Sequence, residues 1–417
     1  MLLISVIAAF ALMTWFALQL AEVINFSPTL FNYTLFTPQS EPEDEPVSEQ
    51  AETNAPGETI VGVPDAAAIT DPQSNLIYKT SQEPFELPIN GATGYTTVRT
   101  AMFVDNGEGG QSEVMLDEAT PFLILGEEGD MWHIAVDGMI GQVAHLLCMI
   151  NLPDVIPSIR YNITNSNYSE FRTSGVDIPG ITGMALYNTR SYNERLGREE
   201  HVVPALYSMA KKIHHAQQLA RENGETLVIF EAFRPYATQR LIDSSLTSLL
   251  DERPDLDANV NNGPWYTGWF ISQSVSNHQR GCAIDVGLAS VEMDLAASGD
   301  YAYYQIKSLT YYNMPTRIHE LSVAAVAFAY PVSSTSKTAW IGTPFSTGMA
   351  SNPEAIKLFN YCIEAGLSPL ASEWWHFNDL DARAHVPSHS RGDFVLAVSL
   401  SVPPYTYPSQ FNNRNGS

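Results

Sequence analysis

The chain has 417 residues, 45% of them hydrophobic, which is enough for two or three domains with a sizeable buried core. Its 21 basic and 46 acidic residues give a formal net charge of −25, a balance that disfavours polyanionic partners such as nucleic acid. The three cysteines, Cys148, Cys282 and Cys362, are too few for a disulfide framework, and we interpret them as small buried thiols.

The N-terminal segment predicts a membrane anchor. Residues 1–21 carry no charge and are mostly apolar, and about twenty such residues span a bilayer as a helix. No basic residue precedes them and no convincing small-x-small cleavage site is present, so an uncleaved anchor over residues 1–25 is favoured over a cleaved signal, with its orientation left open. The acidic residues that follow have no basic neighbour before Lys79, and we predict a disordered linker over residues 26–92.

Residues 93–150 predict a small all-β domain. Its β-type runs, separated by Gly- and Asp-rich turns, lie at 97–99, 121–125, 131–136 and 140–143. Asp137-Gly138 is a strong signal for a two-residue hairpin. The run from Trp132 to Val143 resembles the closing hairpin of bacterial SH3 domains. That resemblance implies a small barrel that binds cell-wall peptide or packs against a catalytic domain.

Residues 151–410 predict a second domain in which helices and strands are mixed. Apolar spacing, β-branched runs and capping pairs such as Asn352-Pro353 define its elements. In chain order, they are a helix over 204–223, a buried strand over 226–230, a helix over 238–251, a loop over 255–268, a helix over 353–365 and a central strand over 372–377.

Two clusters in this domain carry the residue types of a catalytic zinc site. His278 and Asp285 are seven residues apart, and a turn at Gly281 would let both approach one ion. His376 adds a second imidazole from another strand. Two histidines and a carboxylate leave a tetrahedral zinc ion with one position open for water. His319, His385 and His389 have no partner at ligand spacing and are interpreted as structural.

Three further residues suit the chemistry around such an ion. Glu373, three residues before His376, is placed to take a proton from the water and pass it to a leaving amine. Arg234 follows an adjacent strand and is suited to stabilise an oxyanion. Ser276 is interpreted as orienting a ligand or a substrate carboxylate. Ser276, His278 and Asp285 also have the residue types of a serine-hydrolase triad, but three residues on one short turn rarely reach that geometry, and no nucleophile elbow is present.

The two clusters together resemble a known signature. Ser276-x-His278-x-x-Gly281-x-Ala283-x-Asp285 followed by Glu373-x-x-His376 is similar to the motif of the zinc D,D-peptidases that share a fold with the hedgehog signalling domain. The resemblance spans residues 187–379. Arg280-Gly281, Phe233-Arg234-Pro235 and Trp374-Trp375 resemble the D-alanyl-D-alanine dipeptidase branch of that family.

The resemblance implies an α+β fold, with a small, mainly antiparallel sheet that carries all three ligands and helices packed on one face. It implies one Zn²⁺ held by His278, Asp285 and His376, with Glu373 as the catalytic acid/base and Arg234 as the transition-state stabiliser. Substrate contacts are expected at Ser276, Glu231 and Trp375. Two positions depart from the dipeptidases: Glu231 and Ser346 stand where those enzymes commonly have aspartate.

We therefore expect a membrane-anchored, extracytoplasmic zinc peptidase that cleaves D-Ala-D-Ala. A D,D-carboxypeptidase that trims peptidoglycan stem peptides is the alternative within the same chemistry. A non-catalytic wall-binding protein is the alternative from a different class, although such a protein has no need for Glu373 and Arg234.

Overall fold

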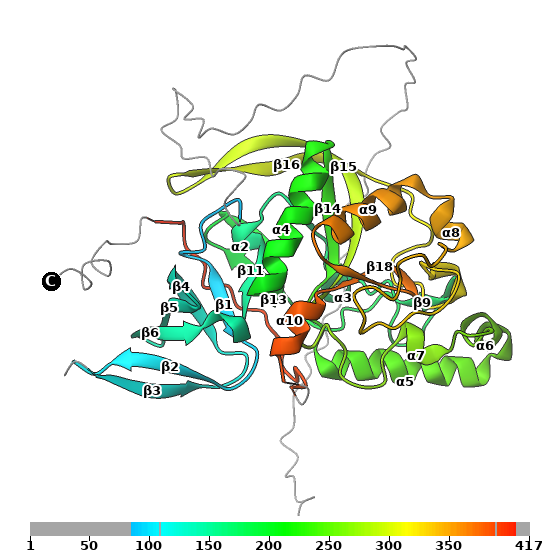
Figure 1. The fold of residues 1–417 in the computed structure, drawn as a ribbon, viewed down its shortest axis with the longest axis horizontal. Coiled ribbons are helices and arrows are strands. Elements are labelled where there is room, and N and C mark those ends of the chain that lie inside the picture. The colour runs from blue at the N-terminus through cyan, green and yellow to red at the C-terminus, as the bar shows by residue number, and fades with distance from the viewer. Residues whose placement is uncertain (1–84, 108–109, 388–389, 406–417) are drawn as a thin grey trace, which may run out of the picture. The chain divides into compact units, whose positions relative to one another are not determined.

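The computed structural model describes residues 85–107, 110–387 and 390–405, and it is a mixed α+β structure with antiparallel sheets (Figure 1). The predicted anchor and most of the predicted linker lie outside these residues. Within them, no helix is both long enough and apolar enough to cross a membrane. Residues 85–92, assigned above to the linker, belong to the fold, because the apolar side chains of Phe85 and Leu87 are buried.

The first sheet has eight strands in the order β13-β7-β1-β4-β5-β6-β2-β3. Its strands are β1 (Thr93–Thr96), β2 (Thr100–Asp105), β3 (Gln111–Leu116), β4 (Pro121–Glu128), β5 (Met131–Val136), β6 (Met139–Ala144), β7 (Cys148–Asn151) and β13 (Pro204–Leu206).

The predicted hairpin between β5 and β6 is confirmed. Asp137 and Gly138 have φ angles of 48° and 77°, the pair of positive values that a two-residue type I′ turn requires. The predicted run at 97–99 is wrong, since these residues connect β1 to β2. There the Thr97 hydroxyl donates to the Leu147 carbonyl at 2.7 Å, which holds the connection against the 3-10 turn η1 (His145–Leu147).

The first sheet continues beyond residue 150. β13 pairs with β7 through Ala205 and Ile150, and it leads directly into helix α4 (Tyr207–Glu222). One apolar core, to which Trp132 and Leu227 both belong, runs through both sheets. The predicted boundary at 150 is therefore a point where the chain passes between sheets that are packed together.

The second sheet has the order β17-β18-β15-β14-β8, with β16 added to the far part of β15. All of its pairs are antiparallel except β8 with β14. Its strands are β8 (Arg160–Tyr161), β14 (Glu225–Glu231), β15 (Ala283–Ser298), β16 (Tyr301–Tyr311), β17 (Ser368–Leu370) and β18 (Glu373–Asn378). Two short hairpins lie outside both sheets: β9 (Arg172–Thr173) with β10 (Val176–Asp177), and β11 (Arg190–Asn193) with β12 (Arg198–His201).

Helix α4 packs on β14 of the second sheet and on β7 and β13 of the first, so it lies between the two sheets (Figure 1). The predicted helices over 238–251 and 353–365 are confirmed as α5 (Tyr236–Glu252) and α9 (Pro353–Glu364). The predicted helix over 204–223 is confirmed from residue 207 onward as α4, but residues 204–206 form the strand β13 instead. Asn352 caps α9 by accepting a hydrogen bond from the Ala355 amide, as its sequence position predicts. The other helices are α2 (Leu152–Val155), α3 (Thr164–Asn167), α6 (Pro254–Val260), α7 (Thr267–Phe270), α8 (Thr347–Ala350), α10 (Leu380–His385) and the 3-10 turn η2 (Val323–Ala325).

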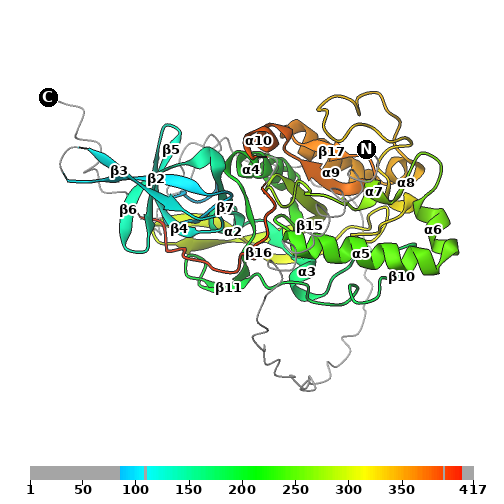
Figure 2. The ribbon, with the colours of Figure 1, turned by 90° about the horizontal axis from the view of Figure 1, so that it is seen from below.

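The predicted loop over 255–268 is wrong in its first half, which forms α6. Pro254 occupies the first turn, and Leu256 and Val260 bury one face of the helix. Figure 2 shows α5 and α6 at the opposite end of the view from β2 and β3. The segment 390–405 then crosses back to the first sheet, where the Leu400 amide donates to the Thr93 hydroxyl at 2.9 Å.

Candidate metal centre

Three side-chain atoms from the two sequence clusters converge on one point. His278 Nε2 lies 3.2 Å from His376 Nδ1 and 3.4 Å from Asp285 Oδ1, and the last two atoms are 3.0 Å apart. Ligand atoms at about 2.0–2.1 Å from a tetrahedral zinc ion are separated by about 3.3 Å, because that is the edge of a tetrahedron of this size. The three donors therefore have the spacing that zinc needs.

Neighbouring strands of the second sheet place most of these groups. In the register of the sheet, Asp285 on β15 lies beside Glu231 on β14 and beside His376 on β18. The expectation that the sheet carries all three ligands is wrong for His278, which lies in the turn that leads into β15. Gly281 closes that turn with a φ of +68°, and a side chain there would come within 2.8 Å of the Met149 sulfur.

The hydrogen bonds of the two imidazoles decide which nitrogens face the centre as acceptors. His278 Nδ1–H donates to the Ala232 carbonyl at 2.6 Å, so its Nε2 carries the lone pair. His376 Nε2–H donates to Asn378 Oδ1 at 3.0 Å, and that amide oxygen also accepts from Asn277. In the neutral form of both rings, two imidazole lone pairs and a carboxylate oxygen thus converge on one point. Such an arrangement is unfavourable alone and favourable around a cation.

Glu373 lies at the edge of the same group. Its Oε2 is 3.6 Å from His376 Nδ1, although residues three apart on a regular strand point to opposite faces. The register between β17 and β18 shifts at this point, where Leu370 is paired with Glu373 and Pro369 with Phe377, and the irregularity turns both side chains inward. Burial raises the pKa of Glu373 to about 8, with a lowering by His376 and a further raising by Asp285.

Arg234 lies behind the centre in a buried network. Its Nε donates to Glu231 Oε2 at 2.6 Å, its Nη1 to Gln239 Oε1 at 2.7 Å and its Nη2 to Asp285 Oδ2 at 3.1 Å. Burial lowers the pKa of Arg234, but the carboxylates of Glu231 and Asp285 outweigh it and keep the pKa above its usual value. The guanidinium remains charged and faces the outer oxygen of a candidate metal ligand.

His319 belongs to this network, although its sequence position gave no sign of it. It comes 34 residues after Asp285, outside both motifs, and its Nε2 lies 3.1 Å from Asp285 Oδ2. Glu231, Asp285 and His319 form a second group with donor atoms close enough for an ion. The Arg234 guanidinium contacts both carboxylates of that group. The positive charge that balances these carboxylates is therefore that of Arg234.

The three predicted substrate contacts have internal partners. The Ser276 hydroxyl accepts from the His278 amide at 3.3 Å and so shapes the ligand turn. Glu231 is fully buried and accepts hydrogen bonds from Asn165 and Tyr187 as well as from Arg234. Trp375 is 1% exposed and packs edge-on against His319 at 6.1 Å between ring centroids. Ser346, one of the two positions that differ from the dipeptidase pattern, caps helix α8 by accepting a hydrogen bond from the Met349 amide.

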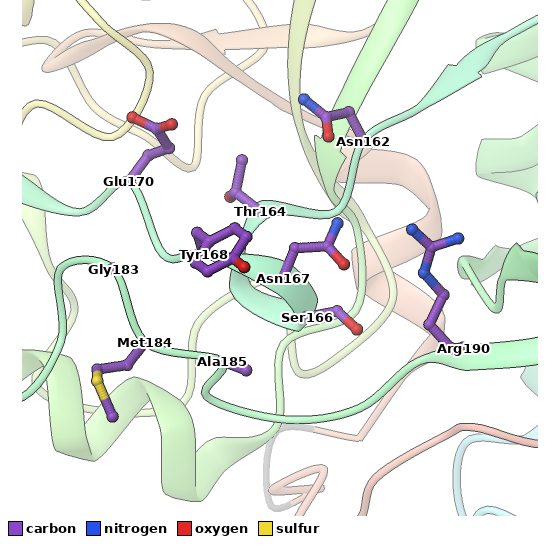
Figure 3. Close-up of a pocket in the computed structure, with 10 residues that line it drawn as sticks. All are labelled: Asn162, Thr164, Ser166, Asn167, Tyr168, Glu170, Gly183, Met184, Ala185 and Arg190. Atoms are coloured by element: carbon purple, nitrogen blue, oxygen red, sulfur yellow. The ribbon is translucent and has the colours of Figure 1, made fainter. Parts of the chain in front are cut away.

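A pocket of about 720 Å³ lies beside α3, whose residues Thr164, Ser166 and Asn167 form part of its wall (Figure 3). It is lined by Asn162, Thr164, Ser166, Asn167, Tyr168, Glu170, Gly183, Met184, Ala185 and Arg190. The Thr164 hydroxyl lies 3.5 Å from His319 Nδ1, so the pocket wall touches the network at that residue. None of the site residues predicted from the sequence lines this pocket.

Compared with models of known protein families and with curated proteins, the chain matches none.

Proposed function

We propose that this chain is a zinc-dependent D,D-peptidase that hydrolyses the D-Ala-D-Ala bond in cell-wall metabolism. The observation that carries the proposal is the convergence of His278, Asp285 and His376 at 3.0–3.4 Å with their lone pairs facing inward. The second sheet with its helices is proposed to be a hedgehog/D,D-peptidase-like catalytic fold, and the first sheet an SH3-like barrel packed against it. The N-terminal segment is proposed as a membrane anchor that holds these domains outside the cytoplasm.

In this proposal His278, Asp285 and His376 hold the ion, and the chain supplies the proton chemistry. A zinc ion in such a site acts as a Lewis acid toward water and the scissile carbonyl. Glu373 takes a proton from the attacking water and returns it to the leaving amine nitrogen, so that one amide and one water become one acid and one amine. Burial raises the pKa of Glu373, which is the direction that makes this carboxylate a better proton acceptor.

In this proposal Arg234 stabilises the transition state. Three of its five N–H groups are held by Glu231, Gln239 and Asp285, so its position is fixed before substrate arrives. The proposal requires the remaining N–H groups of Arg234 to face the reacting carbonyl, because a fixed guanidinium there stabilises a developing oxyanion without reorganising during the reaction.

A D,D-carboxypeptidase is the second candidate, and the surroundings of Glu231 and Ser346 favour it. A free dipeptide has an ammonium group next to the scissile bond, and a carboxylate is the natural partner of that group. Glu231 is committed to Arg234, and the hydroxyl of Ser346 caps a helix. A stem peptide, in which the corresponding nitrogen is an amide, does not need such a carboxylate.

The test gives the zinc-loaded full-length protein free D-Ala-D-Ala and a stem pentapeptide in parallel, and follows D-Ala release. Hydrolysis of the free dipeptide supports a D-alanyl-D-alanine dipeptidase, the first candidate. Turnover of the pentapeptide alone supports a D,D-carboxypeptidase, the second candidate. The Glu373→Ala variant is the control for chemistry. If wild type and variant bind both peptides but neither hydrolyses them, the chain is a wall-binding protein and the enzyme proposal is rejected.

A further inference from the structure

The two oxygens of Asp285 face different surroundings. Oδ1 points to the ring nitrogens of His278 and His376, as described above. Oδ2 lies 3.1 Å from Arg234 Nη2 and 3.1 Å from His319 Nε2. A carboxylate oxygen has two lone pairs, and these two donors use both of them. Oδ2 therefore has no lone pair left for an ion.

His319 is held in place at a cost in backbone energy. Its φ of +59° lies in the left-handed region, which a non-glycine residue adopts rarely. Its ring is 0% exposed and stacks on Phe171 with 4.2 Å between centroids and 9° between planes. Strained, fully packed residues persist where the surrounding structure over-determines them, and they gather at functional sites.

The contacts of the ring also show which nitrogen is the donor to Asp285. A carboxylate only accepts hydrogen bonds, so the nitrogen that faces Asp285 Oδ2 carries a hydrogen. The other nitrogen, Nδ1, faces the Thr164 hydroxyl at 3.5 Å. His319 is thus a rigid donor aimed at one oxygen of a candidate ligand.

We propose that His319 is a positioning residue of the metal centre. Together with Arg234 it occupies Oδ2 of Asp285, which makes this carboxylate a one-oxygen ligand and keeps a coordination position free for substrate or water. Without His319, Oδ2 regains a lone pair, and Asp285 turns to bind through both oxygens. The inference rests on the proposed metal centre and adds to it a residue outside both sequence motifs.

The experiment compares three variants of the full-length protein by zinc dissociation constant and by the visible spectrum of the Co²⁺-loaded form. His319→Phe keeps the stacked ring and removes the donor. His319→Asn tolerates the positive φ but is too short to reach Asp285. His319→Gln retains an N–H donor of similar reach. His201→Phe is the matched control, because His201 is also a buried imidazole bonded to a threonine, at Thr189, and it lies outside the network.

We expect His319→Phe and His319→Asn to weaken zinc binding about 10–100-fold, the usual effect of removing a partner of a metal ligand. Their Co²⁺ spectra should lose the intense bands of four-coordinate cobalt, and His319→Gln should restore both properties. The His201→Phe control should leave both unchanged.

Wild-type zinc affinity and an intense Co²⁺ spectrum in a folded His319→Phe or His319→Asn protein would overturn this inference and leave the proposed function standing. Failure of both variants to fold would assign His319 to the core and overturn it as well. Absence of zinc binding in the wild-type chain would instead reject the metal centre, and the proposed function with it.

Discussion

The Nε2 atom of His278 and the Nδ1 atom of His376 lie 3.2 Å apart, and in the neutral form of each ring the hydrogen is on the other nitrogen. Each ring donates its remaining N–H to an oxygen on the far side, so both lone pairs are directed at the same point. Asp285 Oδ1 adds a third acceptor.

Removing the metal should destabilise the fold, because an ion that binds only the folded chain adds its binding free energy to stability. With free zinc at 100 times its dissociation constant, that contribution is about 2.7 kcal/mol. A chelator should therefore lower the unfolding temperature of the wild-type protein. The His376→Ala variant should show the lower temperature at the outset and no response to the chelator. An equal response in both proteins would contradict a site that includes His376.

The Glu373→Gln variant should keep zinc and lose turnover. The carboxamide has nearly the same size as the carboxylate, so the packing around His376 is retained, while the group that moves the proton is gone. We expect kcat to fall about 10²–10⁴-fold, the usual range for general acid–base catalysis. Steady-state kinetics with metal analysis of the same sample checks this. Undiminished kcat in a zinc-loaded variant would remove Glu373 from the mechanism.

The Arg234→Met variant should unfold at a much lower denaturant concentration. It leaves Glu231 and Asp285 as buried carboxylates without their shared cation, and breaking such a pair costs about 3–5 kcal/mol. Urea unfolding of the metal-free protein measures the change. Arg253→Met is the control, because Arg253 pairs with Asp255 on the exposed surface, and no measurable change is expected there. Similar midpoints for the two variants would show that the Arg234 network does not hold the fold.

The Gly281→Ala variant should combine a backbone cost with a displaced ligand. A left-handed φ costs an alanine about 1–2 kcal/mol, and its Cβ would also meet the Met149 sulfur at 2.8 Å. Gly129→Ala is the matched control, since Gly129 has a φ of +59° and nothing within 4 Å of the added carbon. Both variants should lose stability, but only Gly281→Ala should bind zinc more weakly. Equal zinc affinity in the two would show that this turn does not position His278.

Acid should destabilise the fold through His201. Burial lowers the pKa of His201 to about 3, with further lowering by Arg190 and Arg160, whereas an unfolded histidine has a pKa of about 6.5. Between these values the unfolded chain binds one more proton. This contribution to stability is complete above about pH 6.5 and is lost as the pH falls toward about 3, by up to about 1.4 kcal/mol per pH unit.

The His201→Gln variant tests this assignment. Its free energy of unfolding, measured with urea from about pH 7 to about pH 4, should fall less steeply than that of the wild type by the contribution of one proton. Identical slopes in the two proteins would show that His201 is not the group that titrates.

Local signals in the sequence predicted the elements that depend on near neighbours. The positive φ of Asp137 and Gly138, the Asn352 cap and the Gly281 turn all follow from the preferences of a few adjacent residues. The amphipathic spacing of α4 and α5 is equally local. Helix α6 was not predicted, because a segment of seven residues has only two apolar side chains on its buried face, Leu256 and Val260, and two are too few to define a helical period.

The candidate site was predictable only in part, because some of its contacts join residues that are far apart in the sequence. The residue types and spacing of the two clusters predicted His278, Asp285 and His376 as metal ligands and Glu373 as the acid/base. The structure brings these side chains together. That they hold zinc and cleave a peptide stays a prediction. No local signal indicated His319, because its contact with Asp285 depends on how a distant segment folds back over the sheet.

By itself, the sequence determined the residue types of the centre and the turns and helices that deliver them. Only the tertiary structure decided which oxygen of Asp285 faces the ligand group and which faces Arg234 and His319. The register of β14, β15 and β18 sets that choice, since it places Asp285 between Glu231 and His376. Strand register is selected by the burial of whole faces of the sheet and by long-range pairing, which no spacing along the chain encodes.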